Sequence, residues 1–208
     1  MFKLLLYIIL FLGIVPALLA LIKKCSLGSI APFVYLTAIG AAYEAVFSLF
    51  LEKNSAIWFA TYDILAFLAI LYYFYRLNFP KMRLLSLIFL VSFLATAGSI
   101  YILKYDNIFF KQQGILFLLN ILVFIFTILW FWNTFVKMEI GSLWKEPDFY
   151  YISGLFIYHA TTFMLFLLSD IIIKFDADKF FDYWILNIVA NFLLKSFLII
   201  GVWRTSHK

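Results

Sequence analysis

Charged side chains are scarce in this sequence. Asp, Glu, Lys and Arg together make up 13% of its 208 residues, whereas about a quarter is usual in a soluble domain. Apolar residues make up 66%, aromatic residues 22%, and the mean hydropathy is +1.05. Such a chain has too few polar side chains to cover a water-exposed surface. The scarcity excludes a soluble domain and predicts an integral membrane protein that crosses the bilayer several times.

Cysteine and histidine are almost absent, which removes several kinds of active site. Cys25 is the single cysteine, so this chain forms neither an internal disulfide nor a cysteine-based metal centre. Only two histidines occur, and neither belongs to a His-Glu-x-x-His zinc motif. The Gly-x-Gly-Asp motif of intramembrane aspartyl proteases and an Arg/His cluster suited to a phosphatase are also missing. We therefore expect no enzyme and no metal site.

Seven apolar segments are each long enough to cross the hydrocarbon core, which takes about 20 residues of helix. They cover residues 2–22, 29–51, 55–75, 84–103, 114–136, 149–173 and 183–203. The first is too long for the core of a signal peptide and lacks a small-residue cleavage site, so we expect a retained helix. The stretches between the segments are too short to fold alone. The sequence predicts an all-α, seven-transmembrane-helix bundle, with residues 1–208 forming one domain.

The basic residues between these segments indicate the orientation of the bundle. The net charge is +5, but it forms no dense basic cluster of the kind that binds nucleic acid. Nine basic residues fall on one predicted side and six on the other. The richer side holds Lys23, Lys24, Arg76, Lys81, Arg83, Lys137, Lys145, Arg204 and Lys208. By the positive-inside rule we expect the N-terminus outside, the C-terminus in the cytoplasm, and the bundle in a bacterial inner membrane.

The last segment carries three polar residues at a spacing of four: Asn187, Asn191 and Lys195. On an α-helix this spacing places them above one another on a single face, opposite a face of Ile, Val, Leu and Phe. Amide and ammonium groups are costly in contact with hydrocarbon. We therefore expect this stripe to face protein or a water-filled cavity.

Four titratable residues fall well inside apolar segments: Glu44, Asp63, His159 and Lys195. At about 1.5 Å of rise per residue, Asp63 and Glu44 lie about 4 and 6 Å to the outer side of their helix centres. By the same measure Lys195 and His159 lie about 2–3 Å to the inner side. An unpaired charge at this depth costs roughly 2.5–3.5 kcal/mol. We expect Lys195 to pair with a carboxylate, and Asp63 is the better candidate because its depth is closer.

Three interpretations of Lys195 stay open. It forms a buried ion pair that only fixes helix packing, or it belongs to a polar cavity for a small-molecule ligand or a proton. Alternatively, its long side chain extends to the cytoplasmic headgroups. Asn120 on the fifth segment would help to line a cavity or would bond a neighbouring helix. His159 alone is more typical of a neutral, hydrogen-bonded histidine than of a proton relay.

Local signals predict helix starts and packing surfaces. Pro147 is suited to the first position of the sixth helix, beside acidic residues that favour the positive end of the helix dipole. Small residues such as Gly40, Gly98 and Gly154 predict close approach of neighbouring helices. Aromatic residues at the expected helix ends predict belts at the lipid headgroups. They are Tyr72, Tyr73, Tyr75, Trp130, Trp132, Trp144, Tyr150, Tyr151, Tyr183 and Trp184.

Seven helices, an outside N-terminus and a lysine in the middle of the seventh helix resemble the plan of the microbial rhodopsins. In that family the lysine binds retinal as a Schiff base, and Asp63 falls where its counter-ion would lie. The third and sixth segments lack the Trp and Pro pattern that walls the chromophore. Asn191 also replaces an acidic residue that is usual in the pumps of that family. The main expectation is therefore no cofactor, with retinal as the alternative that this resemblance implies.

A second resemblance covers about a quarter of the chain. The stretch Pro147-Asp148-Phe149-Tyr150-Tyr151, followed by Gly154 and Tyr158, resembles the sixth helix of small, uncharacterised bacterial seven-helix membrane proteins. The stretch Trp184…Asn187…Asn191…Lys195 is similar to their seventh helix. Such proteins stand alone or are similar to the sensor portion of membrane histidine kinases. The resemblance implies a sensor that hands its state to a cytoplasmic partner. Because this chain stops at Lys208, we expect no kinase output of its own.

These observations predict a non-enzymatic, sensor-like or accessory membrane protein with a polar pocket around Lys195. Its expected partners are the lipid bilayer and a cytoplasmic signalling protein, with a small-molecule ligand and a homo-oligomer as further candidates. A transporter or channel is the first alternative. That class usually contains matched helix interruptions in two halves, and the four prolines here do not form such a pair.

Overall fold

Apolar runs of this length cross lipid only as helices, because hydrocarbon offers no partner for free backbone N–H and C=O groups. The computed structural model describes residues 2–51, 56–77, 80–102, 108–137, 142–175 and 177–206, and within these ranges it contains seven α-helices and no strand. The helices are α1 (Phe2–Ile22), α2 (Ala31–Tyr43), α3 (Ala56–Arg76), α4 (Pro80–Ile102), α5 (Ile108–Lys137), α6 (Pro147–Phe175) and α7 (Ala177–Thr205). Two short 3₁₀ turns, η1 (Gly28–Ile30) and η3 (Leu143–Lys145), and a π-helical segment, η2 (Glu44–Phe50), complete the order. The predicted all-α fold is confirmed.

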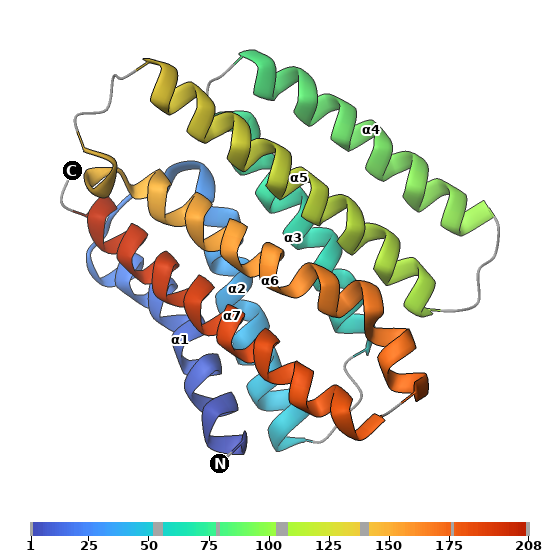
Figure 1. Cartoon of the computed structure of the whole chain (residues 1–208). Helices are drawn as coiled ribbons and strands as arrows, with labels where there is room; N and C mark the ends of the chain where they lie inside the picture. Colours follow the sequence, from blue (N-terminus) through green and yellow to red (C-terminus); the bar gives the residue numbers. More distant parts are fainter. Residues whose placement is uncertain are drawn as a thin grey trace.

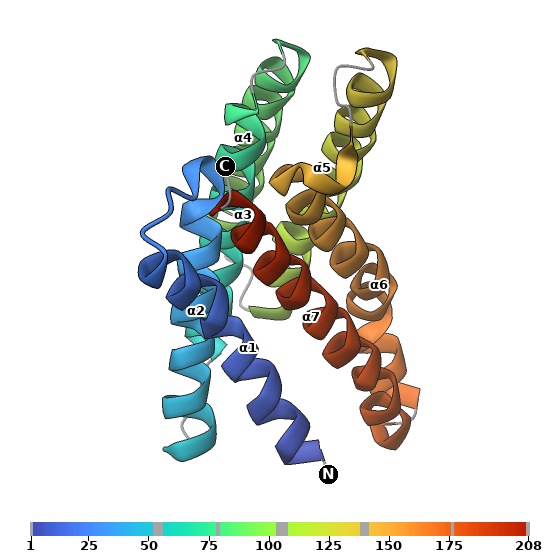
Figure 2. The same ribbon diagram turned by 90° about the vertical axis from the view of Figure 1, so that its left-hand side faces the viewer.

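Successive helices run in opposite directions along the bundle (Figure 1). The pair α6–α7 packs most extensively, and α1 packs against both α2 and α7, so the first and last helices are neighbours. Helix α5 joins the two groups of helices because it packs against α3, α4 and α6. In the side view, α2, α3 and α4 stand on one side and α6 and α7 on the other (Figure 2). The two termini lie at opposite ends of the bundle.

Five helical stretches among the described residues are long and apolar enough to cross a membrane. They are Gly28–Phe47, Ile57–Arg76, Met82–Ser99, Gly114–Val136 and Trp184–Thr205. In α1 the apolar stretch is the shorter Tyr7–Ile22. The chain is therefore an all-helical integral membrane protein, while seven spans and the N-out, C-in orientation stay predictions. The orientation was predicted from the basic residues on the two sides of the bundle. Of these, Lys53, Lys104 and Lys208 lie outside the described residues.

Several helices begin before the residue that hydropathy predicted. Helix α4 begins at Pro80 rather than at residue 84, α5 at Ile108 rather than 114, and α7 at Ala177 rather than 183. Hydropathy marks the part of a helix that lies in hydrocarbon, whereas backbone hydrogen bonding continues into the polar residues that flank it. The predicted start of the sixth helix is confirmed. Helix α6 begins at Pro147, where a residue without an N–H group is tolerated.

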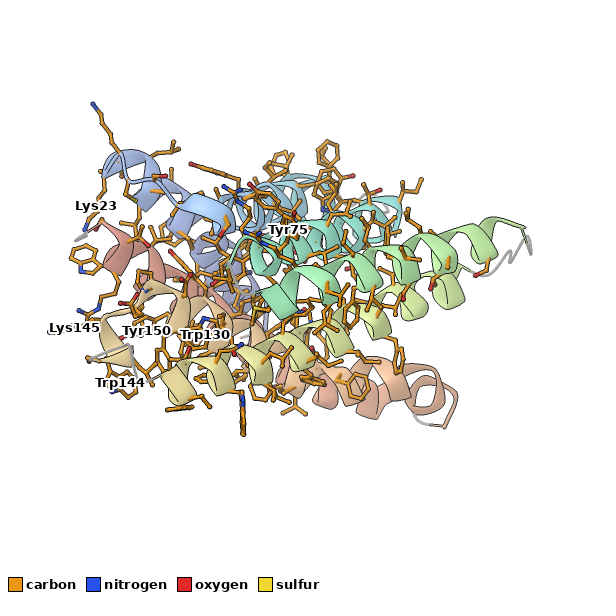
Figure 3. All side chains as sticks on the ribbon, turned by 90° about the horizontal axis from the view of Figure 1, so that it is seen from above. Lys23, Tyr75, Trp130, Trp144, Lys145 and Tyr150 are labelled. Atoms are coloured by element: carbon orange, nitrogen blue, oxygen red, sulfur yellow. The ribbon has the colours of Figure 1, made fainter. Side chains whose placement is uncertain are left out.

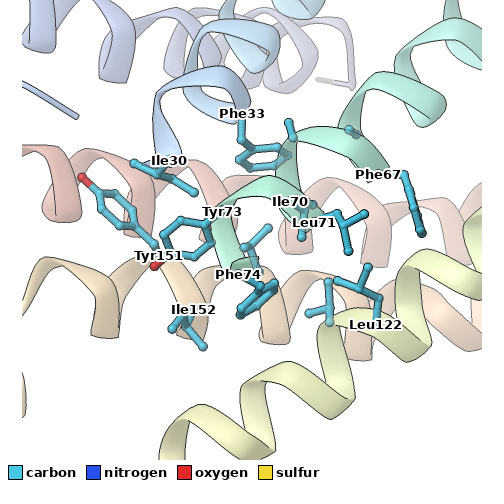
Figure 4. Close-up of a cluster of buried hydrophobic side chains, with 14 of the residues drawn as sticks. Ile30, Phe33, Phe67, Ile70, Leu71, Tyr73, Phe74, Leu122, Tyr151 and Ile152 are labelled. Atoms are coloured by element: carbon cyan, nitrogen blue, oxygen red, sulfur yellow. The ribbon is translucent and has the colours of Figure 1, made fainter. Parts of the chain in front are cut away.

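Helix α3 lies at the centre of an aromatic core (Figure 4). Its side chains Phe67, Tyr73 and Phe74 are almost completely buried. Phe74 stacks on Phe126 of α5 with 4.9 Å between ring centroids, and Tyr73 meets Tyr151 of α6 edge-on at 6.3 Å. Offset and edge-to-face contacts of this kind are the favoured arrangements of aromatic rings. They hold α3 against α5 and α6.

The prediction of interfacial aromatic belts is correct for only part of the set. Four members are exposed, which a belt requires: Tyr72, Tyr75, Trp132 and Trp144. The members that are buried against other helices, for which the prediction is wrong, are Tyr73, Trp130, Tyr150 and Tyr151. Position near a helix end indicates depth in the membrane. Rotation of the helix about its axis decides whether the ring meets lipid or a neighbouring helix.

Glycines permit close helix contacts at two of the three positions predicted. A Cβ atom at Gly154 of α6 would lie 2.7 Å from Phe197 Cβ of α7. A Cβ at Gly40 of α2 would lie 2.8 Å from the ring of Tyr62 on α3. A Cβ at Gly98 of α4 would meet no atom of the described residues within 4 Å, so its predicted role in packing is wrong. Helix α4 lies at the edge of the bundle, where fewer helices surround it (Figure 1).

Candidate functional site

Lys195 is the buried cation of the bundle interior, with a side chain on α7 that is 6% exposed. Its Nζ donates a hydrogen bond to the backbone carbonyl oxygen of Ile9 on α1 at 3.1 Å. Gly13, one turn further along α1, permits this approach. A Cβ at Gly13 would lie 3.3 Å from Lys195 Cε and 2.8 Å from Ala41 Cβ of α2. The amine therefore ends on a neighbouring helix, and the interpretation in which it extends to the cytoplasmic headgroups is wrong.

Glu44 is a carboxylate within electrostatic range of Lys195. It is the half-buried first residue of η2, which follows α2 directly and packs against α1. The sequence predicts Asp63 as the better partner, because its estimated depth is closer to that of Lys195. Depth does not reveal which side of its helix a residue occupies. The fold brings Glu44 to the junction where α7 meets α1.

Two tyrosine hydroxyls link further polar groups to this junction. The hydroxyl of Tyr158 on α6 lies close to the side chain of Asn191 on α7. The hydroxyl of Tyr62 on α3 lies close to Thr37 of α2, whose Oγ1 donates a hydrogen bond to the carbonyl of Phe33 at 2.8 Å. A buried tyrosine hydroxyl needs such partners because it has left its hydration shell. The two tyrosines therefore bridge α6 to α7 and α3 to α2.

Asp63 belongs to the same group through these tyrosines. The hydroxyls of Tyr62 and Tyr158 lie within electrostatic range of each other and of both Asp63 and Glu44. Asp63 is half-buried on α3, next to Tyr62 in the chain. We use the name polar cluster for the six residues gathered here. They are Glu44, Tyr62, Asp63, Tyr158, Asn191 and Lys195.

The polar stripe on α7 faces protein, as its spacing predicted. Asn187 and Lys195 are buried and Asn191 is half-buried. The Nδ2 of Asn191 donates to the backbone carbonyl and to the side-chain Oδ1 of Asn187, each at 3.0 Å. These bonds within α7 orient the Asn191 amide toward Tyr158 on α6. The stripe thus contacts α6 at Asn191 and α1 at Lys195.

His159 and Asn120 form a separate buried pair between α6 and α5. His159 Nδ1 lies 2.9 Å from Asn120 Oδ1, and Asn120 Nδ2 donates to the carbonyl of Leu116 at 2.7 Å. Because the amide nitrogen is used as a donor, Oδ1 is the acceptor and His159 Nδ1 carries the proton. The expectation of a histidine hydrogen-bonded between helices is confirmed. The ring of Tyr158, 5.1 Å from that of His159, places this pair next to the polar cluster.

Sequence reasoning missed three partners of Lys195 and Asn191: the Ile9 carbonyl, Gly13 and Tyr158. Every residue has a backbone carbonyl, so the sequence does not indicate that the carbonyl of Ile9 accepts this hydrogen bond. Gly13 and Pro16 are unusual residues for the middle of an apolar helix, and they were the available signal that α1 is approached closely there. Tyr158 was part of a resemblance but was not assigned to a site.

The fold and the site define a class: an all-helical integral membrane protein with a partly buried cluster of charged and hydroxyl groups. Among the described residues, no group of three or more His, Cys, Asp or Glu side chains is arranged to hold a metal ion. Comparison with protein-family models, curated proteins and solved structures finds no match to this chain.

Proposed function

We propose that this chain is a non-enzymatic, sensor-like membrane protein that transmits the state of its polar cluster to a cytoplasmic partner. The observation that carries the proposal is the position of Lys195, which bonds α1 at Ile9 and interacts with Glu44 at the start of η2. An ionisable residue inside a membrane bundle is expensive to maintain and usually has a functional role. Here one lysine connects three helical segments, so a change at the lysine affects all three.

The proposed switch is a change in the attraction between Lys195 and Glu44. Protonation of Glu44, or binding of a small polar ligand between the two groups, weakens this attraction. Lys195 then keeps its hydrogen bond to Ile9 but loses the attraction of Glu44, and the preferred packing of α1 and η2 against α7 changes. A segment of π-helix has strained hydrogen bonding and occurs often at functional sites, which suits η2 to such a change. The equilibrium between two packings is what the stimulus would shift.

The signal would leave at the end of the bundle that holds most of the basic residues. There Lys23, at the end of α1, donates a hydrogen bond to Ser206 Oγ at 2.9 Å and lies 3.2 Å from the ring centroid of Trp203. A shift of α1 against α7 at the polar cluster therefore reaches this end. With seven spans and the positive-inside orientation, this end is cytoplasmic and the membrane is a bacterial inner membrane.

A transporter or channel is the second candidate, and one observation favours it. The polar cluster brings two carboxylates and two tyrosine hydroxyls from several helices within electrostatic range of one another, and intramembrane carboxylates often mark proton or ion pathways. A retinal protein is less favoured. The Lys195 amine is occupied by the Ile9 carbonyl and its stem packs against Gly13, which leaves the lysine poorly placed for a Schiff base.

Distance measurements by spin labelling test the sensor proposal. In a Cys25→Ser background, labels are placed at Ile22 of α1 and Ile200 of α7, two exposed apolar positions. We expect Glu44→Gln and Lys195→Met to shift or broaden the distance distribution in lipid nanodiscs. Asn120→Leu removes a buried polar group outside the polar cluster and should leave the distribution unchanged. Identical distributions in all variants would mean that the cluster only fixes packing.

Proteoliposomes separate the two candidates. A pH-sensitive dye inside the vesicles reports proton uptake under an applied membrane potential. We expect no uptake above that of empty vesicles. Uptake that Glu44→Gln abolishes would replace the sensor proposal with a transporter or channel.

A further inference from the structure

An apolar groove of about 520 Å³ lies between α5 and α6, on a different face from the polar cluster. Six apolar side chains and Thr127 line it; the apolar ones are Ile128, Phe131, Trp132, Phe135, Val136 and Phe156. Ile128, Trp132 and Val136 are each more than 60% exposed, so the groove opens outward from the bundle. These residues belong to the membrane-spanning stretch Gly114–Val136, so the groove opens toward lipid.

An exposed lysine, Lys145, and an exposed tryptophan, Trp144, stand near one end of this groove. Phe131 of the groove contacts Phe149, and the Phe149 ring in turn contacts Trp144 with 5.1 Å between centroids. Trp144 and the adjacent Lys145 are exposed and lie together at one end of the bundle (Figure 3). Helix α5 ends at Lys137, the residue after Val136. The apolar groove thus leads to the end of the bundle at which Trp144 and Lys145 lie.

We propose that this groove binds an anionic phospholipid of the bilayer. One acyl chain lies in the groove, and the phosphate lies at the basic end near Lys145. The chain gains apolar contacts with the rings of α5 and α6, while the lysine attracts the negative headgroup. Tryptophans such as Trp144 favour the headgroup level, which places this end at the correct depth for a phosphate. The proposal is independent of the polar cluster and of the sensor function.

Charge favours a lipid over a second copy of the chain as the occupant. Two copies that met through this face would be related by a two-fold axis along the membrane normal, which brings identical ends together. The Lys145 side chains of both copies would then be neighbours, and like charges repel. Lys145 is exposed to an incoming headgroup, whereas Glu146 is half-buried and Asp148 is directed to the Tyr73 hydroxyl, from which it accepts a hydrogen bond at 2.8 Å.

Quenching of tryptophan fluorescence by brominated lipids tests the proposal on the full chain. The protein is placed in phosphatidylcholine vesicles that contain increasing fractions of dibrominated phosphatidylglycerol or dibrominated phosphatidylcholine. The signal of Trp132 is the difference between the native protein and the Trp132→Phe variant. We expect the anionic lipid to quench Trp132 at a several-fold lower mole fraction than the zwitterionic lipid.

Two lysine variants show whether the headgroup is recognised. Lys145→Gln should reduce the preference for phosphatidylglycerol to nearly that of phosphatidylcholine. Lys24→Gln removes an exposed lysine in the turn that follows α1, away from α5 and α6, and it should keep the preference. Both positions are exposed, and circular dichroism confirms that both variants are folded. Equal quenching by the two lipids in the native protein would overturn the proposal. So would a Trp132 that neither lipid quenches, together with cross-linking of two copies through Phe135→Cys.

Discussion

At the scale of single residues, the main feature is Lys195, a lysine on α7 whose amine bonds to another helix, α1. Lys195 is 6% exposed, and hydration cannot stabilise its charge. The Ile9 carbonyl supplies one hydrogen-bond acceptor and Glu44 supplies the opposite charge. Gly13 makes room because any larger residue would displace the lysine stem or Ala41. Removal of one partner is costly because the other charge then stays buried without compensation.

A double-mutant cycle tests the assignment of Glu44. Lys195→Met leaves Glu44 without its counter-charge, and Glu44→Gln leaves Lys195 with the Ile9 carbonyl as its main partner. Breaking a buried pair costs about 3–5 kcal/mol, and we expect the lower end because Glu44 is half-buried. The double variant should recover about 0.5–3 kcal/mol relative to the sum of the single losses. The measurement is the free energy of unfolding in detergent micelles.

The cycle has two comparisons. Lys195→Met combined with Asn120→Leu should be additive to within about 0.5 kcal/mol, because these residues belong to different polar groups. Lys195→Met combined with Asp63→Asn should show a smaller coupling than the Glu44 cycle. If the largest coupling is found with Asp63, the assignment to Glu44 is wrong.

At the scale of helices, the close packing of α6 against α7 depends on glycines that leave room for aromatic side chains of the other helix. Gly154 of α6 lies against Phe197 of α7, and Gly201 of α7 lies against the ring of Tyr151 of α6. The Tyr151 hydroxyl then lies 3.0 Å from Thr205 Oγ1, one turn beyond Gly201. Without a hydrophobic driving force between helices in lipid, close packing and hydrogen bonds of this kind hold them together. The same pair carries Tyr158 and Asn191 of the polar cluster.

Alanine substitutions of two glycines should have opposite effects. Gly154→Ala places a methyl group 2.7 Å from Phe197 Cβ, and we expect a loss of about 1–3 kcal/mol from overpacking. Gly98→Ala, at a site with no described atom within 4 Å, should stabilise α4 by up to about 1 kcal/mol through helix propensity. Thermal unfolding in micelles followed by circular dichroism measures both. If Gly154→Ala left the thermal stability unchanged, the α6–α7 contact would be looser than in the structure.

At the scale of the whole molecule, the bundle is closed by contact between its first and last helices. Helix α1 meets α7 in the middle of the bundle at Lys195 and at one end through Lys23, Trp203 and Ser206. A cation over an aromatic ring in a partly buried place is a favourable contact. The contact also gathers the ends of α1 and α7 at the basic end. This end is the one we expect in the cytoplasm.

Reporter fusions test the orientation. A reporter that works only in the cytoplasm should be active when it is fused after Lys208. A reporter that works only outside should be active when it is inserted at Asp178, before most of α7. Exchanging the two reporters between the sites is the control, and both should then be silent. The reverse pattern of activity would overturn the orientation and, with it, the cytoplasmic partner in the sensor proposal.

The sequence by itself determined the membrane character, the seven helical segments, the start of α6 at Pro147 and the inward face of α7. These features depend on composition, on the spacing of residues along one helix and on local backbone chemistry. Lipid strengthens such local rules because it forces every backbone group to bond within its own segment. For this reason the predicted segments required only small extensions at their ends.

Only the tertiary structure decided which residues meet. Lys195 and Ile9 are 186 positions apart in the chain, and their contact depends on how α7 packs against α1. Depth estimates alone could not identify whether Glu44 or Asp63 lies near Lys195. The rotation of each helix about its axis also decides which side chain faces the lysine. The same ambiguity applies to Tyr73 and Trp130, which lie near helix ends but are buried against other helices. Helix rotation is set by the packing of all neighbouring helices together, and that packing is a property of the assembled bundle.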